Sequence, residues 1–455
     1  WSRRSGSVWG RLGMSSNEWR EVKLGETATI KGGKRLPKGK SLSKLKNSHP
    51  YIRVRDIGNS RLLNINDNFE YVDDDTQKTI SRYIVNTNDI LISIVGTIGL
   101  IAKVGETLNN ANLTENCAKI INLKEVDSDY LYYFLISEKG QAEIKKATVG
   151  AVQAKLPLKN IQSIKMSLPA LLEQRTIAAT LSCLDDMIEL NNRTNKILEE
   201  MAQAIFKRWF VDFEFPNEDG EPYKSSGGEM VDSQLGEIPR GWRIGRFNDL
   251  IEKTISGDWG KEDKKGNYTQ KVLCIRGADI PEIEKGNKGN APYRFILPKN
   301  FETKELSANE MIVEISGGSP TQSTGRCALI SNELIDAYDV PMVCTNFCRA
   351  VRFKTTNYSH FGYRYWKYLY NQDVFFQYEN GTTGIKNLDL TGILDKELIN
   401  LPSIELLVDF KKMSEVCIKS ICQNASESSN LSKIRDNLLP KLMSGEIRVP
   451  IEEVV

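Results

Sequence analysis

Residues 168–215 read LPALLEQRTIAATLSCLDDMIELNNRTNKILEEMAQAIFKRWFVDFEF, and the rest of the chain is organised around this stretch. Alternating steps of four and three residues from Ile177 reach mostly apolar side chains, which is the a and d pattern of a heptad repeat. Charged residues fill the intervening positions, so one face is apolar and the opposite face is solvated. The pattern predicts a single helix over 171–210, roughly 60 Å long at 1.5 Å per residue. The residues on the stripe are Ile177, Leu181, Leu184, Ile188, Asn191, Asn195, Leu198, Ala202, Ile205 and Trp209.

The same heptad pattern recurs in residues 401–445, LPSIELLVDFKKMSEVCIKSICQNASESSNLSKIRDNLLPKLMSG. Adding 233 to each number moves Leu168 to Leu401 and Asn191 to Asn424. A long helix gains most of its stability from packing, so each of these two needs a partner along its apolar stripe. A buried Asn on the stripe costs stability but fixes the register of a pair. We therefore expect the two helices to pair as an antiparallel coiled coil; the alternative is that each belongs to a separate bundle.

The segments that precede the two helices also correspond to each other. Trp19-Arg20 is matched by Trp242-Arg243, Tyr51–Arg55 by Val272–Arg276, and the buried run 89–95 by 311–315. Strands that come first and helices that come late favour an α+β fold, built as a tandem repeat. The predicted divisions are a non-native leader (1–13), a globular unit (14–168), a helix (169–215), a linker (216–236), a second globular unit (237–401), a second helix (402–446) and a tail (447–455).

Composition and motifs exclude several classes of protein. Of the 455 residues, 40% are hydrophobic and 26% charged, which is ordinary for a globular protein, and no apolar run approaches the roughly 18 residues of a membrane span. The chain has only two histidines, His49 and His360, and no CxxC pair, so we expect no metal site. Gly39-Lys40-Ser41 lacks the first glycine of a P-loop, and no helical pattern follows it. No arrangement of residues suggests catalysis.

Charge is distributed unevenly along the chain, although the net charge is only +2. Lys31 to Arg55 contains nine Lys or Arg and no acidic residue, and acidic residues then concentrate between Asp56 and Asp89. Such segregation is typical of a surface that faces phosphates, and the alternative is a solvated basic loop. The aromatic run 361–370 is better explained by core packing than by base stacking, whereas Trp259 is as well explained by an exposed contact loop as by packing.

Five short motifs in and just before the first long helix resemble the first conserved region of type I restriction-modification specificity subunits, the HsdS family. They are Leu168-Pro169, Glu173-Gln174-Arg175, Asp185-Asp186, Leu198-Glu199 and Phe206-Lys207-Arg208-Trp209-Phe210. The resemblance extends over nearly the whole chain as variable domain, conserved helix, variable domain, conserved helix. It implies a non-catalytic subunit in which two target-recognition domains each read half of a split, asymmetric site on double-stranded DNA.

The resemblance also implies partners and location. The helices would set the spacing of the half-sites and dock two methyltransferase subunits, through which restriction and translocase subunits join. S-adenosylmethionine, ATP and Mg²⁺ would be cofactors of those partners, with none in this chain, and the complex would act in the cytoplasm of a bacterium or archaeon, without a membrane. The alternatives are a specificity subunit of a related methylation-based phage-defence system and, in another class, a structural coiled-coil scaffold that does not recognise DNA.

Candidate site residues follow from these patterns. Basic, hydroxyl and aromatic side chains in the loops and Gly turns of both units are the groups that contact phosphates and bases. The DNA-binding candidates are Lys31, Lys34, Arg35, Lys38, Arg53, Arg55, Thr97, Lys155, Lys253, Trp259, Lys261, Arg276, Ser316, Ser319, Thr382, Thr383 and Lys386. The candidates for partner docking and spacing on the helices are Gln174, Arg175, Asn191, Leu198, Phe206, Trp209, Asn424, Leu431 and Leu438.

Overall fold

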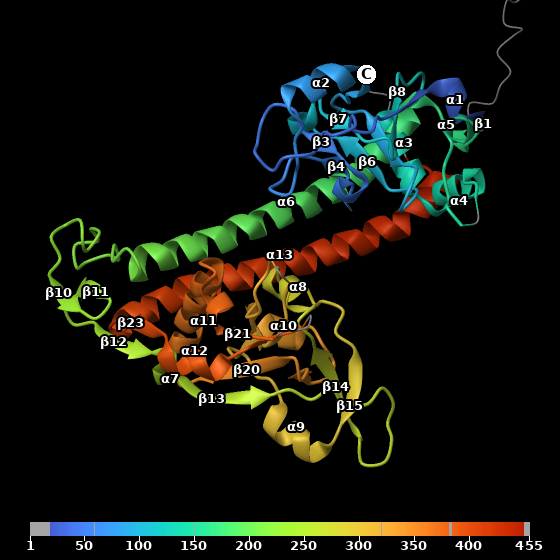
Figure 1. Ribbon diagram of the computed structural model, residues 1–455. Helices are drawn as coiled ribbons and strands as arrows, with labels where there is room; N and C mark the ends of the chain where they lie inside the picture. The colour runs from blue at the N-terminus through green and yellow to red at the C-terminus, as the bar shows by residue number, and fades with distance from the viewer. Residues whose placement is uncertain (1–18, 59, 151, 320, 382–384, 450–455) are drawn as a thin grey trace, which may run out of the picture. The chain divides into compact units, whose positions relative to one another are not determined.

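A computed structural model describes residues 19–449 except 59, 151, 320 and 382–384 (Figure 1). The leader predicted for residues 1–13 lies outside the described residues. The chain divides into two compact units, the first formed by residues 1–189 with 430–455 and the second by residues 190–429. Each unit contains one globular segment together with part of each long helix.

The first unit is built on a five-stranded sheet with the order β2-β8-β5-β6-β4. Its strands are β2 (Thr29–Gly32), β8 (Cys117–Ile121), β5 (Ile90–Ser93), β6 (Ile101–Val104) and β4 (Leu62–Leu63). Two further pairs are β1 (Arg20–Lys23) with β9 (Lys165–Leu168), and β3 (Tyr51–Ile52) with β7 (Asn112–Leu113). The helices are α1 (Leu24–Thr27), α2 (Asp74–Ile80), α3 (Ser128–Ile136), α4 (Glu138–Ala147) and α5 (Leu158–Gln162), with 3₁₀ turns η1 (Val54–Asp56), η2 (Ser81–Tyr83) and η3 (Glu106–Leu108).

The second unit contains a four-stranded sheet, β13-β20-β16-β18, and two three-stranded sheets, β15-β14-β19 and β17-β22-β21. These strands are β13 (Ile251–Ser256), β20 (Cys348–Phe353), β16 (Met311–Glu314), β18 (Cys327–Leu329), β15 (Tyr293–Ile296), β14 (Gln270–Ile275), β19 (Met342–Cys344), β17 (Ser316–Gly317), β22 (Lys386–Leu388) and β21 (Glu379–Asn380). The pairs are β10 (Met230–Ser233) with β11 (Gly236–Pro239) and β12 (Arg243–Arg246) with β23 (Leu398–Leu401). The helices are α7 (Phe247–Leu250), α8 (Ile280–Glu284), α9 (Pro298–Lys304), α10 (Asn332–Asp336), α11 (Thr356–Asn371) and α12 (Leu390–Lys396), with the 3₁₀ turn η4 (Val374–Tyr378).

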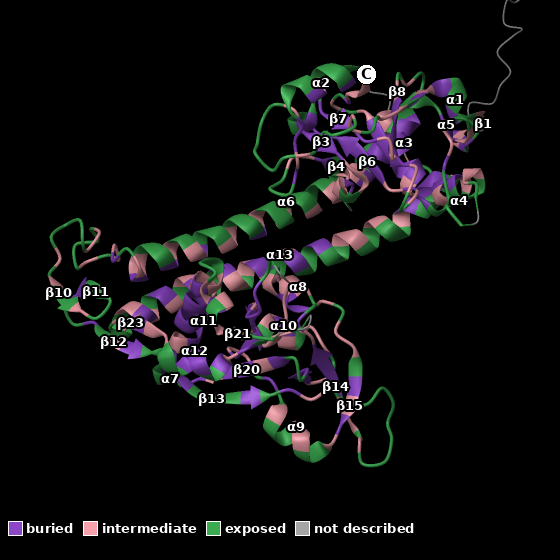
Figure 2. Ribbon diagram, viewed as in Figure 1, coloured by how far each residue is buried: buried purple, intermediate pink, exposed green. Residues whose placement is uncertain are grey.

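The aromatic run on α11 forms the core of the second unit. Much of α11 is buried (Figure 2). Phe361, Tyr363, Tyr365 and Trp366 are all buried, and the Trp366 indole donates to the carbonyl of Gly325 at 2.7 Å. The prediction of core packing is confirmed for these four rings, whereas Tyr368 and Tyr370 of the same run are only partly buried.

The two long helices are confirmed as α6 (Leu171–Phe210) and α13 (Ile404–Ser444). In the first unit Arg435 pairs with Asp185 at 2.6 Å, and in the second unit the Asn424 amide donates to Asn195 Oδ1 at 2.9 Å. Asp185 precedes Asn195 whereas Arg435 follows Asn424, so the helices run antiparallel, as predicted. The Asn that meets Asn424 is Asn195; Asn191, one turn earlier, donates to Glu427 instead.

One local expectation is wrong. The alternating side chains of Tyr51–Arg55 predict a strand over all five residues, but the strand ends at Ile52, because Arg53 precedes a 3₁₀ turn and its amide donates to the Asp56 carboxylate at 2.7 Å. The segment predicted as a linker, 216–236, contains the strand β10, which pairs with β11. No described helix is long and apolar enough to cross a membrane.

Candidate nucleic-acid interface

The basic loop of the first unit lies between β2 and β3 and is exposed at Lys34, Arg35 and Lys38. Acidic residues fold back onto it: Lys40 pairs with Asp73 at 3.1 Å and Lys46 with Asp67 at 3.4 Å. The basic run and the acidic run, separate in sequence, are therefore partly paired in space. Pairing leaves the first part of the loop, from Lys34 to Lys38, as its most cationic part.

Arg35 in this part of the loop is oriented by a carboxylate. Its Nε donates to Glu115 Oε1 at 2.7 Å, while 81% of its side chain remains exposed. The hydrogen bond and the charge of Glu115 raise the pKa of Arg35. Lys34 lies 5.7 Å from the ring of Tyr83, and Lys31 is exposed on β2. These cations can contact phosphates without rearrangement.

Arg53 and Arg55 belong instead to an internal ion-pair network. Arg53 binds Glu70 at 2.5 Å, Arg55 lies 3.4 Å from the same carboxylate, and Asp56 lies within 4 Å of both arginines. Burial raises the pKa of Asp56 to about 6, although Arg55 acts to lower it. Arg53 is thus committed to the interior of its loop, whereas Arg55 keeps 57% of its side chain exposed.

In each unit a glycine-containing turn lies next to a later hairpin. The turns are 96–99 in the first unit and 316–319 in the second, and the hairpins are 149–155 and 379–388. In the first unit Val95 and Val149 both pair with Lys155, which brings the turn at Thr97 beside Lys155. In the second unit β17 and β21 both pair with β22, which brings Ser316 beside Lys386. Lys386 is held by Glu379 at 2.6 Å, and the Ser319 amide donates to Gln322 at 2.8 Å. Thr382 and Thr383 lie outside the described residues.

Trp259 stands in the loop after β13, with 38% of its surface exposed. The guanidinium of Arg294 lies 3.9 Å from its ring centroid and is itself paired with Glu262 at 2.9 Å. Sequence reasoning missed Arg294 because the strand pairing that places β15 next to this loop leaves no local signal. Nearby, Lys261 lies over Tyr268 at 4.4 Å, Lys253 is exposed on β13, and Arg276 is held by Asp279 at 2.9 Å.

Some of the docking residues predicted on the helices are buried inside their own unit. Gln174 is 1% exposed, and its amide donates to the carbonyls of Glu125 and Pro169. Phe206 is 0% exposed and packs among aromatic rings, with Trp209 and Leu438 partly buried against the cores. Neither Gln174 nor Phe206 can contact a partner directly. Of the other docking candidates, Arg175 is exposed, and Asn191, Leu198, Asn424 and Leu431 are half-buried along the helix pair.

A second apolar stripe on α6 does reach the surface, and sequence reasoning missed it. Leu190, Ile197 and Met201 are 61%, 49% and 49% exposed. They follow heptad spacing one position ahead of the buried stripe, so the periodicity was visible in the sequence. Apolar side chains exposed in a row on one helix favour a partner.

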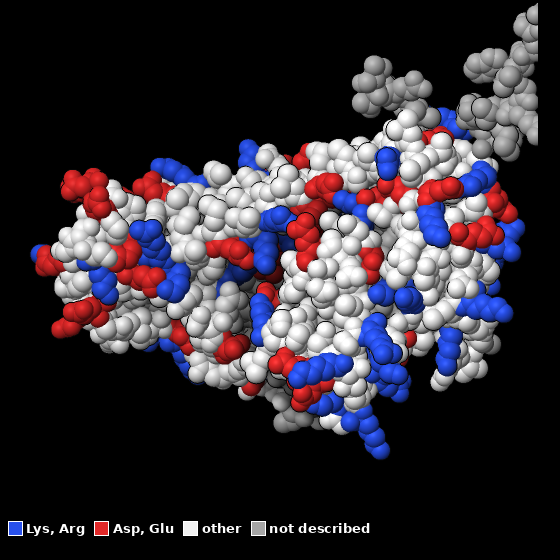
Figure 3. Space-filling view, turned by 90° about the horizontal axis from the view of Figure 1, so that it is seen from above, with Lys and Arg blue, Asp and Glu red and all other residues white. Residues whose placement is uncertain are grey.

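Among the described residues, no group of three or more His, Cys, Asp or Glu could hold a metal ion. On the face shown in Figure 3, basic and acidic side chains alternate in small groups, without one continuous basic surface.

Comparisons with known proteins agree with this geometry. Residues 16–200 match the family described as the type I restriction modification DNA specificity domain. The MjaIX specificity subunit of Methanocaldococcus jannaschii is 25% identical over 446 residues, covering 96% of this chain and 95% of that protein. The HindI specificity subunit of Haemophilus influenzae is 24% identical over 422 residues, covering 80% and 84%.

The fold is shared with a solved structure as well. The crystal structure of the type I restriction-modification system S subunit from M. genitalium matches 95% of this chain and 98% of its own, with a TM-score of 0.53 and 16% identity. The likeness shows the same fold, with two globular segments that are each followed by a long helix. Residues 16–200 match the DNA specificity domain family, and the chain is similar over nearly its whole length to type I restriction-modification specificity subunits.

Proposed function

We propose that this chain reads a bipartite, asymmetric DNA target through its two globular segments and contributes no catalytic group of its own. The observation that supports this most strongly is the repeat: both units build the same turn-and-hairpin arrangement, yet their loops carry different side chains. Two similar scaffolds with different contact surfaces suit two different half-sites.

The test is domain replacement. The first globular segment, residues 19–168, is exchanged for the corresponding segment of a relative, and methylation is mapped in cells that carry the methyltransferase subunit. We expect one half-site to change and the other to stay the same. A scaffold without DNA recognition predicts that neither half-site changes.

The partners and cofactors are part of the same proposal. Two methyltransferase subunits would dock on the helices and would supply S-adenosylmethionine, while restriction subunits would bring ATP and Mg²⁺, in the cytoplasm of a bacterium or archaeon. The exposed apolar stripe on α6 supports docking there. A related methylation-based defence system would use the same surfaces.

Neutralising the first part of the basic loop should weaken DNA binding. In a variant with Lys34, Arg35 and Lys38 all changed to Ala, we expect the slope of log K against log salt to become shallower by about 2 to 3, since each lost phosphate contact removes about one. Titration of duplex DNA at several salt concentrations measures the slope. The matched control changes Lys124, Lys145 and Lys159, which are exposed in the same unit outside the loop. If both variants flatten the slope equally, the loop contributes only through the net charge of the protein and makes no specific phosphate contact.

A further inference from the structure

The two units enter their variable loops at equivalent glycines. A Cβ on Gly33 would lie 2.0 Å from the carbonyl oxygen of Thr114, and one on Gly257 would lie 1.9 Å from that of Thr345. The residue after each glycine then donates its amide to the neighbouring strand, Lys34 to Leu113 and Asp258 to Cys344, both at 2.8 Å. This close approach of two backbones fixes where each loop begins.

The turn on the other side of this contact, between β7 and β8 in the first unit and between β19 and β20 in the second, is also equivalent. Thr114-Glu115-Asn116-Cys117 in the first unit matches Thr345-Asn346-Phe347-Cys348 in the second. The cysteine amide donates to the threonine carbonyl in both, at 3.2 and 2.9 Å. The third residue accepts in both from the strand that leads to the Gly turn, Asn116 from Ile94 at 2.8 Å and Phe347 from Ile315 at 2.9 Å.

Between these shared positions the side chains differ in kind. Two residues after the glycine stands Arg35 in the first unit and Trp259 in the second. Between Thr and Cys stand Glu115 and Asn116 in the first unit, and Asn346 and the 59% exposed Phe347 in the second. The backbone hydrogen bonds around these positions are thus the same in both units, but the first unit carries charged side chains there and the second carries aromatic ones.

We infer that these equivalent positions determine the bases read in the two half-sites, with Arg35 reading a guanine in the first and Trp259 with Phe347 contacting a thymine methyl group in the second. The inference rests on the proposed function. Both half-sites have the same sugar-phosphate backbone, so we expect the structure that the two repeats share to contact it. The half-sites differ in their bases, so we expect the side chains that differ between the repeats to contact the bases.

The chemistry of each set matches a base. Glu115 engages Nε of Arg35, which leaves the two terminal amino groups for O6 and N7 of guanine, the commonest specific contact in the major groove. Trp259 is braced from behind by Arg294, and its loop is held because Asp258 accepts from the Gly260 amide at 3.0 Å and the Asn300 amide at 2.6 Å. A rigid, partly exposed ring gives apolar contact at little cost in entropy.

The test maps methylated sites for single variants of the full chain assembled with its methyltransferase subunit. Arg35→Ala should reduce discrimination for guanine at one position of the first half-site by about 10- to 100-fold. The second half-site should not change. Trp259→Ala and, independently, Phe347→Ala should relax a thymine in the second half-site alone, and Arg35→Lys should relax the first partially, because an ammonium cannot reproduce the planar fork.

Two controls have matched chemistry. Arg20→Ala removes an exposed arginine of the first unit that pairs with Glu125, and Tyr293→Ala removes a 50% exposed ring on β15. Neither should change base preference. Variants that lower affinity evenly for all sequences, or that lose the methyltransferase subunit, overturn the inference. The proposed function is tested by a different experiment: it is wrong if domain replacement leaves both half-sites unchanged, whatever the single variants show.

Discussion

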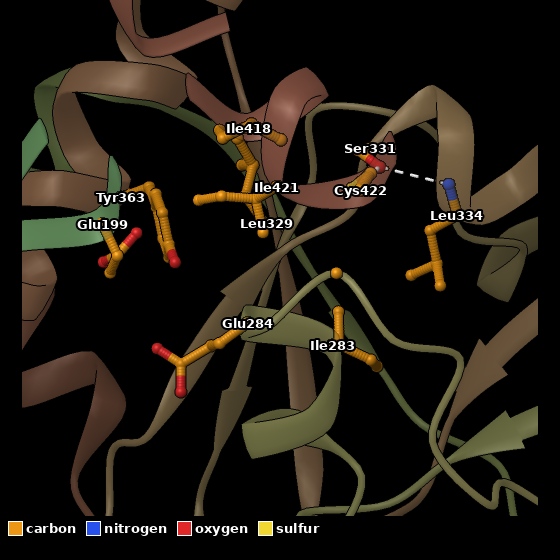
Figure 4. Close-up of a pocket in the computed structure, with 11 residues that line it drawn as sticks. Glu199, Ile283, Glu284, Leu329, Ser331, Leu334, Tyr363, Ile418, Ile421 and Cys422 are labelled. Carbon is orange, nitrogen blue, oxygen red and sulfur yellow. Dashed lines mark hydrogen bonds between the residues drawn. The ribbon is translucent and has the colours of Figure 1, made fainter. Parts of the chain in front are cut away.

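Replacing Glu199 by alanine is expected to lower the free energy of unfolding of the second unit by about 3–5 kcal/mol, the usual cost of breaking a buried ion pair from one side. Glu199 on α6 binds Arg364 at 2.5 Å and Lys367 at 2.6 Å, and Lys367 also binds Glu284 at 2.8 Å. Arg364 is 0% exposed, so the substitution leaves a guanidinium charge in the interior without its carboxylate. Glu199 and Glu284 both line the small cavity drawn in Figure 4.

Urea denaturation of the whole chain measures the effect, and the neighbouring residue supplies the control. Glu200 is 64% exposed in an ion pair with Lys196 at 3.7 Å, so Glu200→Ala should cost less than about 1 kcal/mol. Similar midpoints for the two variants would show that the cluster adds little stability.

The same carboxylate makes a prediction about acid stability. Burial acts to raise the pKa of Glu199, but Arg364 and Lys367 outweigh it and lower that pKa from 4.5 to about 2. A lowered folded-state pKa contributes stability that is complete above about 4.5 and is lost as the pH falls towards 2. Glu199→Gln should therefore show a flatter dependence of stability on pH in that window than the parent chain.

Sequence periodicity predicted the long helices well because their heptads are local and span many turns. It could not select which Asn on α6 meets Asn424, since Asn191 and Asn195 both lie on the stripe. The choice depends on how far one helix slides along the other, and the contact of Asn195 with the carbonyl of Ile421 at 3.0 Å records it. Composition alone does not contain that offset.

The sequence predicted those candidate site residues that lie together in one short segment, but not the partners that reach them from distant segments. The basic loop and Trp259 stand out as residue types in exposed turns. Their partners lie far along the chain, because Glu115 is 80 residues from Arg35 and Arg294 is 35 residues from Trp259. Arg53 shows the converse, because a cation that looks available in the sequence is consumed by Glu70 once the chain folds. Ion pairs between distant segments therefore decide which of many cations can meet DNA.

The exposed apolar stripe on α6, Leu190, Ile197 and Met201, is expected to contribute strongly to binding of a methyltransferase subunit. Leu190→Lys combined with Ile197→Lys should weaken binding of a methyltransferase subunit by at least about 100-fold, because burying each of these side chains contributes about 1.5–3 kcal/mol. Adding 233 gives Gln423, Asn430 and Ile434 on α13, so the corresponding stripe there is polar at two of its three positions. If two methyltransferase subunits dock as proposed, their two docking faces differ, and we expect the variant to bind one methyltransferase copy fewer than the parent. Native mass spectrometry counts the copies. Asn192→Lys, which adds one lysine at an exposed polar position of the same helix, should assemble like the parent. If the double variant retains its full complement at parental affinity, the methyltransferase subunits dock elsewhere on the chain.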